Sequence, residues 1–64
     1  MVFAFDKKSQ VDLINLLTTY LPTALVGSVL DRIDIGSDLK MSFNGVVIGI
    51  IVVDDTVTVA ITEG

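Results

Sequence analysis

The chain contains one long apolar segment, which reads Asn44-Gly45-Val46-Val47-Ile48-Gly49-Ile50-Ile51-Val52-Val53-Asp54-Asp55. Its central eight residues, Val46 to Val53, carry no polar side chain. A helix that crosses a membrane needs about 20 apolar residues, so this run is too short for one and we expect no membrane association. Asn-Gly is the preferred pair for a two-residue β-hairpin turn, and Asp-Asp is a weaker turn signal. We therefore interpret the segment as a β-strand between two turns.

The two turns predict how the neighbouring strands pair with this central strand. If each turn has two residues, the first hairpin pairs Phe43 with Val46, Met41 with Ile48 and Leu39 with Ile50. The second hairpin then pairs Val52 with Val57, Ile50 with Val59 and Ile48 with Ile61. Directly paired residues share one face of a sheet, and every residue in these pairs is apolar. The sequence therefore predicts a three-stranded antiparallel meander within residues 34–62, with one wholly apolar face.

The opposite face of the predicted meander is mixed. Its outer strands present polar or small groups, whereas the central strand presents branched apolar side chains beside a glycine. The residues that we select as a candidate contact surface are Val47, Gly49, Ile51, Val53, Thr58 and Ala60. Gly49 and Ala60 are small enough to let a partner approach closely. An exposed edge of the sheet is the alternative contact.

Residues 6–33 show the periodicity of two helices. In the first helix, apolar residues recur at helical spacing; they are Val11, Leu13, Ile14, Leu16, Leu17 and Leu21. Pro22 should end it near Tyr20, because proline disfavours the helical conformation in the residue before it. Asp6 is the candidate N-cap, and Ser9 is the alternative one turn later. The second helix, Thr23–Ile33, would bury either Leu25, Val29 and Ile33 or Val26, Leu30 and Ile33.

These elements predict a single α+β domain over residues 1–64. Two helices, within residues 6–33, pack on one face of the three-stranded antiparallel meander. Residues 1–5 can add a short N-terminal strand to the sheet.

The composition is unusually apolar for so short a chain. Hydrophobic residues make up 52% of the 64 residues, and the mean hydropathy is +0.79. A domain of this size buries only about 60% of the surface that its unfolded chain exposes, so a monomer needs many polar residues to cover the rest. Cysteine is absent, so disulfide bonds cannot stabilise the fold. We expect a homo-oligomer, most simply a dimer, or binding to another protein.

The charge balance argues against nucleic acid as a partner. Eight acidic residues face four basic ones, for a net charge of −4. Nucleic-acid binding draws much of its affinity from neutralised phosphates, and four dispersed cations supply little of it. The alternative function is nevertheless a small nucleic-acid-associated regulator, in which dimerisation brings together two pairs of Lys7 and Lys8. We place this lysine pair in the first turn of the first helix.

Residues that carry catalytic or metal chemistry are scarce. Histidine and cysteine, the commonest catalytic and zinc-binding residues, are both absent. The adjacent carboxylates Asp54 and Asp55 are interpreted as a hairpin tip. Asp31, Asp34 and Asp38 lack the following glutamate of a calcium-binding loop. We expect no enzyme activity, no cofactor and no bound metal.

The N-terminal residues have no signal-peptide pattern, so the expected location is the cytoplasm. The leading hypothesis is a non-enzymatic protein–protein interaction or assembly module that acts as a homo-oligomer.

Overall fold

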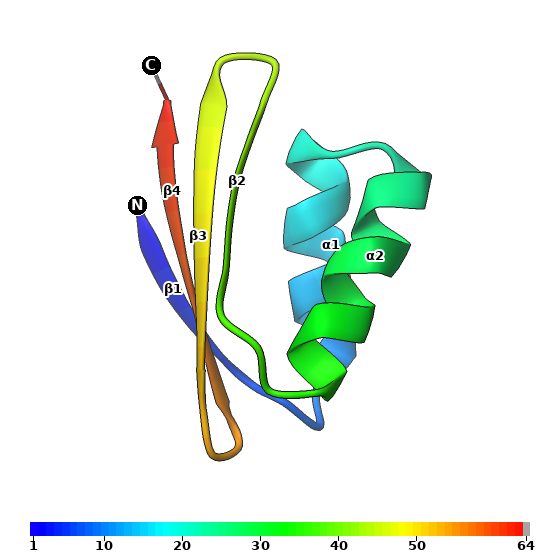
Figure 1. Ribbon diagram of the computed structural model, residues 1–64, viewed down its shortest axis with the longest axis vertical. Coiled ribbons are helices and arrows are strands. Elements are labelled where there is room, and N and C mark those ends of the chain that lie inside the picture. The colour runs from blue at the N-terminus through cyan, green and yellow to red at the C-terminus, as the bar shows by residue number, and fades with distance from the viewer. Residues whose placement is uncertain (64) are drawn as a thin grey trace.

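A four-stranded antiparallel sheet carries two helices on one of its faces in the computed structural model, which describes residues 1–63 (Figure 1). Gly64, the last residue of the predicted domain, lies outside the described residues. The elements are β1 (Val2–Asp6), α1 (Gln10–Tyr20), α2 (Thr23–Asp34), β2 (Leu39–Phe43), β3 (Val46–Val53) and β4 (Thr56–Glu63). The strand order is β1-β4-β3-β2. The predicted α+β class, the helix pair, the meander and the N-terminal strand are thus all confirmed.

The strand register agrees with the one predicted from the two turns. All six predicted pairs are present, from Leu39 with Ile50 to Ile48 with Ile61. Asn44 and Gly45 both have positive φ, at 53° and 82°, as a type I′ turn requires. This turn has the same right-handed twist as the strands it joins, which explains why a two-residue loop suffices.

The strand β1 lies at the sheet edge beside β4. Phe3 is paired with Val59 and Phe5 with Val57, so both phenylalanines lie on the face that the helices cover. Their rings stack with centroids 6.3 Å apart. The N-terminal strand therefore closes one side of the core and adds a fourth strand to the meander.

The hydrophobic core lies between the helices and the apolar face of the sheet. Its buried side chains come from both layers and are Leu13, Leu17, Leu21, Val26, Val29, Ile33, Ile48, Ile50, Val57, Val59 and Ile61. Each such side chain stabilises the fold by about 1.5–3 kcal/mol relative to full exposure. Within residues 1–63 the core contains no buried polar side chain, so hydrophobic burial dominates its energetics.

Two sequence-based expectations about packing need adjustment. The buried face of α2 consists of Val26, Val29 and Ile33, which takes residues from both of the predicted alternatives. Phe43 lies on the predicted apolar face, yet it is 38% exposed. The reason is visible in Figure 1, where the β2–β3 hairpin extends beyond the ends of the helices.

The start of α1 also differs from the first prediction. Asp6 ends β1, and its Oδ1 accepts a hydrogen bond from the Lys8 backbone N–H at 2.9 Å. Asp6 thus forms a turn before the helix. Ser9, the predicted alternative, occupies the N-cap position, but its side chain makes no capping hydrogen bond. Lys7 and Lys8 consequently precede the helix and are not in its first turn. The end of α1 at Tyr20 agrees with the expected effect of Pro22.

Candidate functional site

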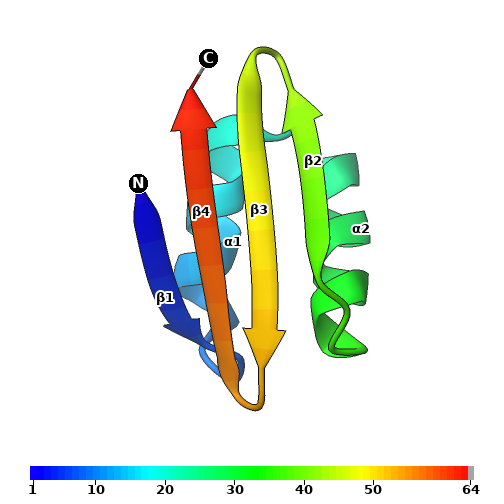
Figure 2. The ribbon, with the colours of Figure 1, turned by 60° about the vertical axis from the view of Figure 1, so that its left-hand side comes forward.

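The six candidate contact residues gather on the face of the sheet that faces away from the helices. Gly49 is paired with Ala60, and Ile51 with Thr58. In Figure 2 the four strands lie in front of the helices, and no part of the described chain covers this side. We call the surface the open sheet face and define it by Val2, Ala4, Val47, Gly49, Ile51, Val53, Thr58 and Ala60.

Several large apolar side chains on the open sheet face are exposed to solvent. The exposed fraction is 53% for Ile51, 61% for Val53 and 71% for Val2. Ile50, which precedes Ile51 in β3, is only 1% exposed, because successive side chains in a strand point to opposite faces. Single exposed apolar residues are common in soluble proteins, but contiguous apolar patches mark contact surfaces. The gathering of exposed apolar side chains on one face therefore indicates a contact surface more strongly than their number does.

Two residues of the open sheet face could not be placed from the sequence. Val2 is paired with Ala60 and Ala4 with Thr58, so β1 extends the face by one strand. The alternation of Phe3 and Phe5 with Val2 and Ala4 was a usable signal for which side chains share a face. The pairing partner of β1 was not readable from a local turn, because β1 ends at Asp6 and β4 begins only at Thr56.

A shallow depression lies in the middle of the open sheet face. Its volume is about 420 Å³, and Gly49 and Ala60 are among its lining residues together with Ile51 and Thr58. Gly49 has no side chain and Ala60 has only a methyl group, so the surface is hollow between larger neighbouring side chains. Asp38 and Lys40 also line it, and they supply one charge of each sign. The depression can thus accept an apolar side chain between two opposite charges.

The Asp38 carboxylate has a structural role beside this depression. Its Oδ1 accepts a hydrogen bond from the Val52 backbone N–H at 3.1 Å. The strand β2 begins at Leu39, so no β2 residue pairs with Val52. Asp38 therefore takes the place of a missing strand residue and satisfies one backbone donor of β3.

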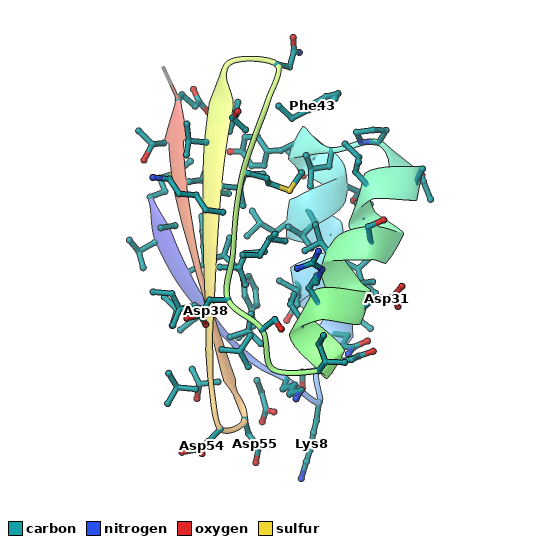
Figure 3. The ribbon with its side chains drawn as sticks, in the orientation of Figure 1. Lys8, Asp31, Asp38, Phe43, Asp54 and Asp55 are labelled. Atoms are coloured by element: carbon teal, nitrogen blue, oxygen red, sulfur yellow. The ribbon has the colours of Figure 1, made fainter. Side chains whose placement is uncertain are left out.

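Lys7 and Lys8 are placed differently from one another. Lys7 Nζ donates a hydrogen bond to the Asp34 backbone carbonyl at 3.3 Å, at the end of α2. The Lys7 backbone N–H donates to the Asp55 carbonyl at 2.6 Å. A cation at a helix C-terminus interacts favourably with the helix dipole, so Lys7 ties α2 to the β3–β4 turn. Lys8 is exposed and points away from the molecule (Figure 3).

The carboxylates do not converge on a common point in the described part of the chain. Asp34 Oδ1 accepts a hydrogen bond from Gln10 Nε2 at 3.1 Å, and Asp38 bonds Val52. Asp54 and Asp55 lie at the tip of the β3–β4 hairpin, far from Asp31 on α2 (Figure 3). Among residues 1–63, no group of three or more potential metal ligands is close enough to hold an ion.

Comparisons with protein-family models, with curated proteins and with solved structures find no match to this chain. None of the helices in the described residues is long and apolar enough to cross a membrane.

Proposed function

We propose that the protein is a non-enzymatic interaction module that self-associates through its open sheet face. The observation that supports this proposal is the uneven covering of the sheet. One face packs under two helices, whereas the other leaves Ile51 and Val53 more than half exposed. The total accessible surface, 3954 Å², is close to the roughly 4,000 Å² expected for a folded monomer of this mass. The chain thus has the compactness of a folded monomer while its open sheet face stays uncovered.

The size of the open sheet face sets the expected affinity. The eight residues of β3 span about 27 Å, and four strands span about 19 Å across the sheet. Because β1 and β2 are shorter, the face covers roughly 400–500 Å². Two such faces would bury about 1,000 Å², the lower limit for a specific interface. The proposed dimer should therefore dissociate in the micromolar range.

Self-complementarity favours a second copy of this chain as the partner. The depression at Gly49 and Ala60 is adjacent, along the strands, to the protruding side chain of Ile51. In a two-fold dimer each contact occurs twice, so the Ile51 of each copy can enter the depression of the other. The charges of Asp38 and Lys40, one of each sign, can then pair across the interface.

The test is the solution mass, measured by light scattering over a dilution series from high to low micromolar concentration. We expect the wild-type protein to form dimers that dissociate on dilution. Replacing Ile51 with lysine should abolish the association while leaving the fold intact, because the new side chain remains at an exposed position. A matched control is Val11→Lys, since Val11 is also exposed (71%) but lies on α1 in the helix layer.

The outcomes separate the alternatives clearly. If Ile51→Lys dimerises as the wild type does, the open sheet face is not the contact surface. If the wild-type protein is monomeric throughout, self-association fails as a function. If both lysine variants lose association equally, the effect is one of net charge and the face has no special role.

A further inference from the structure

The free edge of β2 leaves backbone hydrogen-bonding groups unpaired. Phe43 and Val46 close the two-residue turn, and the residues that close such a turn are hydrogen-bonded to each other. Because hydrogen-bonded and non-bonded pairs alternate along an antiparallel ladder, Met41 and Leu39 also bond β3. The N–H and C=O groups of Lys40 and Ser42 therefore point away from the sheet. The Val52 N–H, which points towards the β2 side and meets Asp38 there, is consistent with this alternation.

A groove runs beside this edge on the helix side of the sheet. It has a volume of about 140 Å³ and is lined by Leu25, Ser28, Val29 and Arg32 from α2 and by Leu39 and Met41 from β2. Most of its lining is apolar, and Arg32 adds one positive charge. A strand added to β2 would direct every second side chain into this groove.

The position of α2 distinguishes the β2 edge from the opposite edge of the sheet. In Figure 2, α2 projects beyond β2, whereas α1 lies behind β4 and β3 and does not extend past β1. A fifth strand beside β2 would therefore lie over a helix that is already in place. A fifth strand beside β1 would have no such support.

The same overhang disfavours a two-fold pairing of this edge with a second copy. Pairing β2 with its own copy would place both α2 helices on one side of the joined sheet. Packed helices need 8–10 Å between their axes, but neighbouring strands are only about 4.8 Å apart. Two helices that both project over the junction would collide. The edge can accept a strand only if that strand brings no helix over the junction on the side of α2.

We infer that the β2 edge binds an extended peptide segment of another protein, which adds to the sheet as a fifth strand. The backbone of the segment would hydrogen-bond Lys40 and Ser42, as in other cases of strand addition. Its apolar side chains would enter the groove, and a carboxylate would face Arg32. The partner is thus an extended segment with alternating apolar residues and an acidic residue on the same side. This site is distinct from the open sheet face.

The probe is a synthetic peptide, acetylated and amidated, with the sequence Glu-Thr-Val-Thr-Val-Thr-Glu. Its odd positions share one side of a strand and carry two valines between two glutamates, whichever direction it binds. The control peptide has lysine at both ends. In an NMR titration up to about 1 mM peptide, we expect saturable shifts of the Lys40 and Ser42 amides and slower exchange of both amide protons. The lysine peptide should bind at least several-fold more weakly.

Two variants test the geometry. Ser42→Pro removes a backbone N–H that points outward, and an edge strand tolerates proline at such a position. The substitution should weaken peptide binding by at least about tenfold. The matched control is Ala4→Pro on the other edge. Met1 and Ile61 bond each other through both backbone groups, so by the same alternation the Ala4 N–H also points outward. This control should bind the peptide as the wild type does.

Arg32, which is exposed on α2, provides a test that needs no proline substitution in a strand. Arg32→Glu should reverse the preference, so that the lysine peptide binds more tightly than the glutamate peptide. Ile51→Lys, which tests the open sheet face, should leave peptide binding unchanged. Shifts confined to Val2–Asp6 or to the open sheet face, absence of saturable binding, or an unchanged preference in Arg32→Glu would each overturn the inference.

Discussion

Gly27 and Gly45 are both exposed, and neither has an atom within 4 Å of the position that a Cβ would take. We nevertheless expect alanine to have opposite effects at the two positions. Gly27 lies inside α2, so Gly27→Ala should raise the free energy of unfolding by about 0.5–1 kcal/mol. Gly45 has a φ of +82°, so Gly45→Ala should lower it by about 1–2 kcal/mol. Thermal unfolding measures both, at about 4–8 °C per kcal/mol for a domain of this size. A neutral Gly45→Ala would contradict the turn geometry.

The Asp38 carboxylate offers a second test at a single residue. Because its Oδ1 accepts the Val52 N–H at 3.1 Å, Asp38→Ala should cost about 0.5–1.5 kcal/mol of folding free energy. Asp38→Asn retains an acceptor and should cost less. Hydrogen exchange provides the specific readout, since the Val52 amide proton should exchange faster in the alanine variant than in the wild type. Equal exchange rates in the two proteins would mean that solvent or another group replaces the carboxylate.

At the level of elements, the helix α1 depends on a small number of core contacts. Leu17 is fully buried and Val11 is 71% exposed, although both lie on the same helix. Leu17→Ala should cost about 2–5 kcal/mol, and Val11→Ala should be nearly neutral. A domain of 64 residues has a total stability of only about 3–10 kcal/mol. Leu17→Ala should therefore leave part of the protein unfolded before any urea is added, which a urea titration measures. Similar losses in both variants would show that the helix packs by another face.

The strands and helices differed in how far the sequence could predict them. The β2–β3–β4 meander was predictable because each turn connects neighbouring strands, so counting outward from Asn44-Gly45 and from Asp54-Asp55 yields every pair. The start of α1 was not, because Asp6 and Ser9 are both good capping residues. Their roles depend on where β1 ends, which the pairing with β4 determines. The six predicted residues of the open sheet face followed from the meander, whereas Val2 and Ala4 required the position of β1.

At the level of the whole molecule, the arrangement of layers was the least predictable feature. Apolar periodicity indicates that α1 and α2 cover the sheet, but it does not say how far each helix lies from the sheet edge. The overhang of α2 beyond β2 is a tertiary property that no local pattern encodes. The groove beside Leu39 and Met41 depends on it, which is why only the open sheet face and a generic free edge could be expected from the sequence.

Self-association through the open sheet face should make the stability of the whole molecule depend on protein concentration. A partner that binds only the folded state stabilises that state by mass action. Raising the concentration from well below to well above the dimer dissociation constant should therefore add on the order of 1 kcal/mol per chain, or several degrees in melting temperature. Ile51→Lys should remove this dependence, and Val11→Lys should retain it. Scanning calorimetry at about 5 µM and 500 µM protein, which spans the expected dissociation constant, measures the difference. A melting temperature that does not change with concentration in the wild type would show that folded chains gain nothing from each other, and the open sheet face would then serve a different protein.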